Sequence, residues 1–367
     1  MSELRDWAEL LRVSALFTVP GDALAGAAAT GRRPGAATAL AAGASLCLYE
    51  AGMALNDWAD RDEDAAERPH RPVPSGRIAP GQALAAAAVL TGAGLGLGFA
   101  AGRPTGWCAT ALAGTVWAYD LRLKHTAAGP AAMASARGLD LLMGAVATAG
   151  PRTARQSPSA GRSPAGSSAD ATVAAPAGSG AGVLARLSSA AVGAWAGPSA
   201  GGTAGAVRRA LLPAAVLGAH TYALTTVSRA ETRGGARGGP LAALGVTAVL
   251  GALVGTDGQP GPAARWRRSG RAGEPGPPGA PGVLGTPGGL GRAVLAGGYA
   301  VTAGRPLVHA VLNPSPQLTQ RAVGGGIRAL IPLQAALAAR SGSPVSAALL
   351  AGLVPVARRL ARKVSPT

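Results

Sequence analysis

The sequence is poor in cysteine and in aromatic residues, and both absences limit the classes of protein that it can encode. Of 367 residues only two are cysteines, Cys47 and Cys108, and both lie within apolar segments. Two such cysteines provide neither a disulfide framework nor a cysteine-based metal site. Aromatic residues make up only 3% of the chain, so a water-soluble core would have to be built from alanine, valine and leucine.

Charged residues are also scarce, and acidic ones most of all. They make up 14% of the chain, with 17 acidic against 34 basic residues, and Lys124 and Lys363 are the only lysines. A net charge of +17 and a pI near 11.5 are typical of nucleic-acid-binding proteins. The arginines, however, lie mainly between apolar segments, as expected of loops that face the cytoplasm and anionic lipid. We therefore expect a lipid bilayer and no nucleic acid among the partners, and keep a nucleic-acid-binding protein as an alternative.

Hydrophobic residues account for 48% of the chain and come in segments of about 15 to 25 residues with few internal charges. Segments of this length match the hydrocarbon thickness of a bilayer. Abundant alanine and glycine suit helices that pack closely in lipid. The sequence therefore predicts an all-α integral membrane protein with nine or ten transmembrane helices, the number depending on a weak segment at 324–340. The predicted spans are 13–31, 36–55, 79–101, 105–119, 128–150, 210–228, 240–255, 291–312, 324–340 and 344–360.

Two stretches of different composition divide the chain. Residues 151–208 and 256–289 are rich in Ser, Gly, Ala, Pro and Arg with little periodicity, which predicts low-complexity loops. We therefore expect a first helical half over 1–150 and a second over 209–367, the latter containing the 256–289 loop. With the N-terminus inside, the short basic loops after the second, fourth and sixth spans all lie on the cytoplasmic side. Apolar residues at helical spacing predict an interfacial helix over residues 3–12.

The densest acidic cluster runs from Asn56 to Asp64, at the end of the second apolar segment. If that helix continues, Asn56, Asp60 and Asp64 recur every four residues, and Asp57 lies on the adjacent row. Oxygen donors without histidine or cysteine suit Mg²⁺, which usually completes its shell with substrate phosphates. We therefore expect Asn56, Asp57, Asp60 and Asp64 to hold Mg²⁺ for a diphosphate substrate. A solvated, charge-rich loop between helices is the alternative.

Basic residues near this cluster could neutralise the remaining phosphate charge. Those that follow it directly, in an Arg-Pro-rich tail, are Arg68, Arg71 and Arg77. Arg12 and Lys124, at the ends of other predicted spans, could also reach a diphosphate. Ionisable groups inside spans are candidates as well, because burying them is costly. Arg137 and Asp140 are three residues apart, and we expect them to form a structural pair. The other candidates are Asp22, Glu50, His220, His309, Tyr119 and Tyr222.

The pattern Asn56-Asp57-x-x-Asp60-x-x-x-Asp64 with its Arg-Pro-rich tail resembles the first aspartate motif of the UbiA superfamily of membrane prenyltransferases. Tyr119-Asp-Leu-Arg-Leu-Lys124 resembles that family's Tyr…Leu-Lys segment after the fourth span. More loosely, the chain is similar to the EboC-like, actinobacterial branch. The resemblance implies a helical bundle around a central cavity in a bacterial cell membrane. It also implies Mg²⁺-dependent transfer of a prenyl group from an isoprenyl diphosphate to a small, often aromatic acceptor.

The resemblance also assigns roles to individual residues. Those implied in catalysis are Asp57, Asp60, Asp64 and Lys124. Those implied in substrate binding are Arg68, Arg71, Arg77, Arg122, Arg229 and Glu231. The metal ligands implied are the four already named, Asn56, Asp57, Asp60 and Asp64.

The chain departs from the family at the second acidic motif, Asp-x-x-x-Asp after the sixth span. Residues 228–235 contain a single carboxylate, that of Glu231. Glu231 could be a reduced metal ligand, Arg229 and Arg233 could contact phosphate in place of a second ion, or the loop could simply be basic. Whether one or two Mg²⁺ bind stays open. So does a second function, that of a non-catalytic membrane carrier or binder of isoprenoid-linked lipids.

Overall fold

A computed structural model describes residues 2–12, 16, 18–150, 200–229, 237–256 and 287–364. Every regular element within these ranges is a helix. The first, α1 (Ser2–Leu10), is amphipathic: Leu4 is 80% exposed, whereas Leu10 is buried. An exposed leucine on a helix rich in charged residues fits the interfacial helix that the sequence predicts here.

The first half of the chain forms six further α-helices and one π-helix. They are α2 (Val19–Ala29), α3 (Ala36–Ala59), α4 (Arg61–Glu67), α5 (Pro80–Ala101), α6 (Arg103–Ala118), the π-helix η2 (Tyr119–Leu123) and α7 (Gly129–Ala149). Proline occupies the first or second position of α5, α6 and α7. There its missing amide hydrogen costs nothing and its fixed φ favours the helix, so Pro80, Pro104 and Pro130 mark three helix starts.

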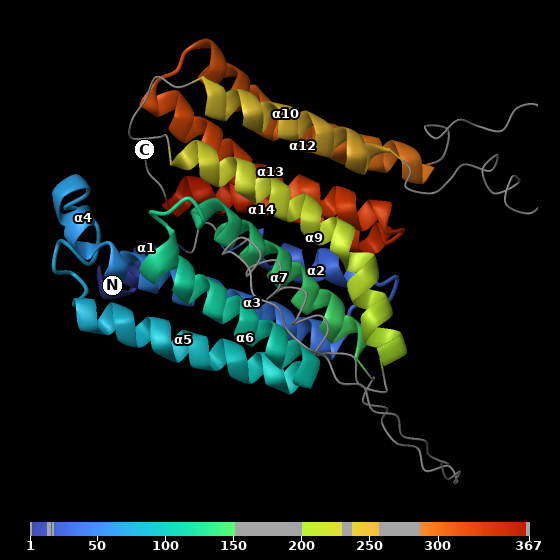
Figure 1. Cartoon of the computed structure of the whole chain (residues 1–367), viewed down its shortest axis with the longest axis horizontal. Coiled ribbons are helices and arrows are strands. Elements are labelled where there is room, and N and C mark those ends of the chain that lie inside the picture. Colours follow the sequence, from blue (N-terminus) through green and yellow to red (C-terminus); the bar gives the residue numbers. More distant parts are fainter. Residues whose placement is uncertain are drawn as a thin grey trace, which may run out of the picture.

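The second half forms five helices that lie beside the first half in one bundle (Figure 1). They are α9 (Ala200–Ser228), α10 (Gly238–Gly255), α12 (Pro287–Leu312), α13 (Pro316–Arg340) and α14 (Pro344–Val364). Because α9 begins at Ala200 and α12 at Pro287, the predicted loops 151–208 and 256–289 are too long at their C-terminal ends. α9 packs along α7, and such tertiary contact stabilises a glycine-rich helix start that composition alone does not reveal.

Small residues let neighbouring helices touch through their backbones. A methyl group at Gly144 of α7 would lie 2.4 Å from the Cα atom of Ala23 in α2. One at Gly26 of α2 would lie 2.0 Å from the carbonyl oxygen of Leu141. Only glycine permits this approach, which is typical of helices packed in lipid. Close backbone packing is how a chain with 3% aromatic residues still fills its interior.

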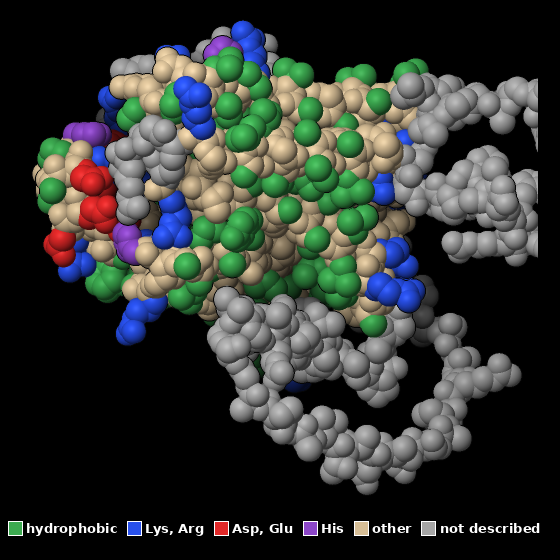
Figure 2. Space-filling view, turned by 45° about the horizontal axis from the view of Figure 1, so that its top comes forward, with side chains coloured by type: hydrophobic (Ala, Val, Ile, Leu, Met, Phe, Trp, Pro, Cys, Tyr) green, Lys and Arg blue, Asp and Glu red, His purple; other side chains and the backbone are tan. Residues whose placement is uncertain are grey.

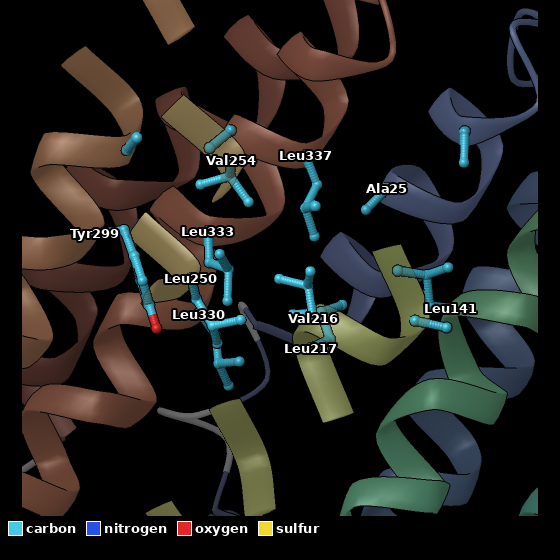
Figure 3. Packing of buried hydrophobic residues seen from close by; sticks show 14 of the residues in the cluster. Ala25, Leu141, Val216, Leu217, Leu250, Val254, Tyr299, Leu330, Leu333 and Leu337 are labelled. Atoms are coloured by element: carbon cyan, nitrogen blue, oxygen red, sulfur yellow. The ribbon is translucent and has the colours of Figure 1, made fainter. Parts of the chain in front are cut away.

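A large buried cluster joins the two halves. It draws residues from α2, α7, α9, α10, α12 and α13, and Figure 3 shows Ala25, Leu217 and Leu333 among them. The side chains are mainly alanine, valine and leucine, with Tyr299 as a large exception. The two halves therefore share one core.

The bundle has the dimensions and surface of an integral membrane protein. Five helices in the described ranges are long and apolar enough to cross a membrane: α3, α5, residues 202–228 of α9, α10 and α13. Their neighbours expose apolar side chains outward, such as Val294 and Val301 on α12. In Figure 2, charged side chains gather toward the two ends of the bundle, and the acidic ones lie at one end. Each predicted span overlaps a helix, including the weak segment 324–340, which is part of α13.

Candidate functional site

The acidic segment lies where α3 passes into α4, at the end of the bundle that also carries α1 (Figure 1). The predicted continuous helix is interrupted at one residue, Asp60, whose φ and ψ are −92° and 4°. Helical hydrogen bonds nevertheless continue across it: the Asp60 amide donates to the Asn56 carbonyl at 2.9 Å, and the Asp64 amide to the Asp60 carbonyl at 2.7 Å. The predicted ligands keep their spacing along the axis, but their side chains fall into two groups.

The first group is centred on Asn56. Its Nδ2 donates to Asp60 Oδ2 at 3.0 Å and to Asp120 Oδ1 at 3.3 Å. Lys124 Nζ forms an ion pair with the other oxygen of Asp60. The arrangement brings together the aspartate motif and the Tyr119–Lys124 segment, which the sequence connects only through their resemblance to one family.

The π-helix η2 presents Asp120 and Lys124 to this group. The Lys124 amide donates to the Tyr119 carbonyl at 2.9 Å, five residues earlier, and such π turns are frequent at functional sites. Asp120 is buried, and burial raises its pKa to about 7. Sequence reasoning gave Asp120 no role, although its place in the Tyr119–Lys124 segment was an available signal.

The second group is held by arginines. Asp57 Oδ1 accepts a hydrogen bond from Arg12 at 3.1 Å and lies 3.5 Å from Arg71. Arg71 also donates to Asp64 Oδ2 at 2.5 Å, and Arg68 lies 3.6 Å from the same carboxylate. Asp57 and Asp64 are both buried, so Arg71 supplies charge compensation to two carboxylates at once.

Arg77, predicted to bind substrate, takes its partners from α1 instead. It forms ion pairs with Asp6 at 2.5 Å and Glu9 at 2.9 Å, and donates to the His70 carbonyl at 2.6 Å. These contacts fasten α1 to the loop after α4. α1 leads directly into Arg12, so the contacts of Arg77 also fix the position of Arg12. Binding of substrate by Arg77 stays a prediction.

The remaining predicted residues differ in how closely they approach the site. Arg122 is exposed on η2. Arg229, at the end of α9, donates to the Thr126 carbonyl at 2.6 Å and so connects the second half to the segment after η2. Glu231 and Arg233 lie outside the described residues.

The donors present fit a hard divalent cation. Both groups offer carboxylate oxygens, with the Asn56 amide oxygen in addition, and Mg²⁺ prefers such ligands. Ligand atoms of Asp60, Glu63 and His125 also lie within 4.8 Å of one another at the exposed edge. Lys124 and Arg71, which now pair with Asp60 and Asp64, are well placed for the phosphates of a substrate.

A cavity of about 240 Å³ extends from this site into the bundle between α3, α6 and α7. Arg12, Asn56 and Asp120 line it at the acidic end. Gly52 and Val116 both line it, and a methyl group at Gly52 would lie 3.0 Å from Val116 Cγ1, so glycine allows α3 and α6 to approach closely there. The geometry thus combines an end rich in oxygen ligands and basic groups with a largely apolar space next to it.

The far end of the cavity corrects one expectation. Arg137 was predicted to pair with Asp140, but its ion pair is with Asp22 of α2 at 2.5 Å. Asp140 instead accepts a hydrogen bond from Ser45 of α3 at 2.7 Å. The sequence could not show this, because the partners lie on different helices.

Comparison with known proteins finds similarity mainly over the first half of the chain. Residues 14–165 match the UbiA prenyltransferase family. A digeranylgeranylglyceryl phosphate synthase of Ignicoccus hospitalis is 34% identical over 148 residues, which are 40% of this chain and 48% of that protein. A 4-hydroxybenzoate octaprenyltransferase of Ralstonia nicotianae is 46% identical over 65 residues, 17% of this chain and 22% of that protein. The chain thus spans about half or less of the curated relatives it matches.

The fold of the whole bundle is also found in a solved structure. The apo structure of a UbiA homolog from Aeropyrum pernix K1 is 16% identical and covers 88% of this chain and 96% of its own, with a TM-score of 0.50. The likeness extends the common architecture beyond residue 165 into the second half. The EboC-like branch stays a prediction.

Proposed function

Because residues 14–165 carry a UbiA prenyltransferase family domain, we propose that this membrane protein transfers a prenyl group from an isoprenyl diphosphate to a small acceptor, in a Mg²⁺-dependent reaction. One observation carries the proposal. Asn56, Asp60, Asp120 and Lys124 converge at the acidic end of the cavity between α3, α6 and α7. Oxygen ligands for a cation and a basic group for phosphate therefore lie where an apolar chain can enter.

Different residues of the site would contribute in different ways to breaking the bond between the prenyl carbon and the diphosphate oxygen. Mg²⁺, held by Asn56, Asp57, Asp60 and Asp64, would supply Lewis-acid stabilisation of the leaving diphosphate. Lys124 and Arg71 hold the diphosphate and stabilise the negative charge that grows on it as it departs with the electron pair. The acceptor supplies the electron pair of the new bond and gives up a proton, which the departing diphosphate takes up. Leu48, Leu112 and Val116 line the cavity and would limit the access of water to the allylic cation.

Substitutions in the acidic segment test whether its aspartates bind the metal. Asp60→Asn and Asp64→Asn should insert into membranes as wild type does, yet lose release of pyrophosphate from isoprenyl diphosphates by about 100-fold or more. Asp62→Asn is the matched control, since the Asp62 side chain is 87% exposed and, among the described residues, forms its ion pair with Arg61. Equal turnover in Asp60→Asn and Asp62→Asn would refute the metal assignment.

A non-catalytic carrier of isoprenoid-linked lipids is the second candidate. The feature that favours it is the lack of any Asp or Glu in α9–α14, where the second acidic motif would be expected at the end of α9. A carrier would bind farnesyl diphosphate equally well with Mg²⁺ or with EDTA and release no pyrophosphate. A transferase would need Mg²⁺ and release pyrophosphate when an acceptor-containing membrane extract is added.

For the orientation, we propose that the acidic end faces the cytoplasm of a bacterial cell. The short basic loops at that end support it through the positive-inside rule. Ser75 lies in an exposed loop there, whereas Arg33 lies in the exposed loop that precedes α3 at the opposite end. In intact cells a membrane-impermeant maleimide should label Arg33→Cys and spare Ser75→Cys. The reverse pattern would invert the topology.

A further inference from the structure

The bundle contains a second cavity, at the end opposite to the acidic segment. Its volume is about 730 Å³, and its lining includes Thr30 and Gly31 after α2 and the end of α13 around Arg340. These residues lie at the end where α3 begins, whereas the acidic segment lies where α3 ends. The 24 residues of α3 span about 36 Å between the two ends. The second cavity is therefore separate from the proposed metal site.

The lining of this cavity is positively charged. Among the described residues that line it, three are arginines and none is Asp or Glu: Arg209 comes from α9, Arg292 from α12 and Arg340 from α13. On the face that Figure 2 shows, the charged side chains at this end of the bundle are Lys or Arg. The proposed topology places this end outside the cytoplasm, where the positive-inside rule does not favour arginine. The three arginines therefore require a different explanation.

Two of these arginines are held at the last turn of α10. Arg340 Nη1 donates to the Leu253 carbonyl at 2.6 Å and to the Thr256 carbonyl at 2.5 Å. Arg292 Nε donates to the Gly255 carbonyl at 3.3 Å, and Arg292 is only 7% exposed. These bonds position both guanidinium groups beside the same helix end. A helix C-terminus carries roughly half a negative charge, so it compensates two guanidinium charges only in part.

The third arginine begins an amphipathic face of α9. Arg209 is exposed and forms no ion pair with another described residue. Leu212 and Val216 follow it at intervals of three and four residues, and both line the cavity. Leu337, one turn before Arg340 in α13, continues this apolar surface. The cavity thus has positive charge toward the end of the bundle and apolar surface toward its middle.

We propose that this cavity binds a phosphate group carried by a lipid, namely an anionic phospholipid of the leaflet at this end. A guanidinium group matches the geometry of phosphate oxygens, and basic pockets between transmembrane helices bind anionic head groups. A volume of about 730 Å³ lies within the roughly 300–1,000 Å³ typical of small-molecule sites. The arginines contact the phosphate, and the apolar surface contacts the first part of an acyl chain. The proposal does not depend on prenyl transfer, because it concerns the other end of the bundle.

Charge reversal at two adjacent arginines tests the site. Arg208 and Arg209 are neighbours on α9 and both are exposed, but of the two it is Arg209 that lines the cavity. Arg209→Glu and Arg208→Glu therefore change the net charge equally and differ in position. Calorimetry measures the binding of dihexanoylphosphatidylglycerol, a short-chain anionic phospholipid, to the purified full chain in detergent.

Arg209→Glu should weaken this binding about tenfold or more, because it replaces a charge-assisted hydrogen bond to phosphate with repulsion. Arg208→Glu should bind within about twofold of the wild type, whereas attraction to a generally basic surface would weaken equally in both variants. Should Arg209→Glu fail to fold, Arg209→Gln and Arg208→Gln give the same comparison, with an expected loss of about fivefold in the first alone. Equal affinities in the two folded variants would overturn the proposal.

Two further ligands distinguish a phospholipid from other sources of phosphate. sn-Glycerol 3-phosphate carries the phosphate without acyl chains, and the wild type should bind it about tenfold more weakly than the phospholipid, because no apolar surface is buried. Equal, Arg209-dependent affinities would overturn the lipid as ligand and assign the site to a soluble phosphate ester. Dihexanoylphosphatidylcholine places a choline cation beside the arginines and should also bind about tenfold more weakly. Equal binding of the two phospholipids would show that the arginines select no charge and would overturn the proposal.

Discussion

The two halves of the bundle differ in the sign of the charge that they carry. All but four of the 17 acidic residues precede residue 150, and helices α9–α14 contain neither Asp nor Glu. The second half contributes arginines and a buried pair, His220 Nδ1 to Tyr299 hydroxyl at 3.0 Å. Within the described residues, carboxylate ligands for a cation therefore come from the first half alone. Under the proposed function, the first half would hold the metal, and the second half would contribute packing and positive charge.

The largest expected effect comes from removing a basic group from the first half, which carries most of the acidic residues. Lys124→Ala should lower pyrophosphate release by about 100-fold or more, because it removes the cation beside Asp60 that would stabilise the leaving group. Arg122→Ala, exposed on the same π-helix, should change it by only a few fold. Comparable losses in both variants would mean that general basicity of the loop, and no particular contact, matters.

Stability should respond to Arg71 more than to its neighbour. Arg71→Ala leaves the buried carboxylates of Asp57 and Asp64 without the cation that bridges them, at a cost of about 2–3 kcal/mol in the free energy of unfolding. Arg68 is 3.6 Å from Asp64 and its side chain is 44% exposed, so Arg68→Ala should cost less than about 1 kcal/mol. Denaturation in detergent measures both. An Arg71→Ala protein as stable as Arg68→Ala would contradict the bridging role.

Packing can be compared at one glycine of each half. At Gly144 a methyl group would meet the backbone of Ala23 at 2.4 Å, so Gly144→Ala should cost about 2 kcal/mol of stability. At Gly326 the nearest atom is Leu224 Cδ1, also at 2.4 Å, but a leucine side chain can change rotamer. Gly326→Ala should therefore lower the melting temperature less than Gly144→Ala. The opposite order would show that the second half is the more rigid.

The smallest expected effect concerns the polar pair of the second half. Tyr299→Phe removes the partner of His220 Nδ1 and should cost about 1 kcal/mol of stability. It should leave the KM for the diphosphate unchanged, because the pair lies outside the cavity lining. Tyr222→Phe is the control, since Tyr222 is 47% exposed. A raised KM in Tyr299→Phe alone would bring the second half into the chemistry.

The site shows which contacts can be predicted from the spacing of residues along the chain and which cannot. The four-residue repeat of Asn56, Asp60 and Asp64 predicts ligands close together, and the hydrogen bond from Asn56 to Asp60 at 3.0 Å agrees. The repeat could not reveal that Asp64 turns to Arg71, because a break of one residue at Asp60 redirects the following helix. Nor could it reveal Asp120, whose approach depends on a π turn in another helix.

The sequence by itself determined the helical segments, the membrane environment and the position of the acidic end. These follow from local properties: the length and apolarity of each segment, and the clustering of charge between segments. Only the tertiary structure decided which charges meet. Arg137 pairs with Asp22 rather than with its near neighbour Asp140, and Arg77 pairs with α1. The physical reason is that the energy of an ion pair depends on distance and burial in space, and helix packing sets both.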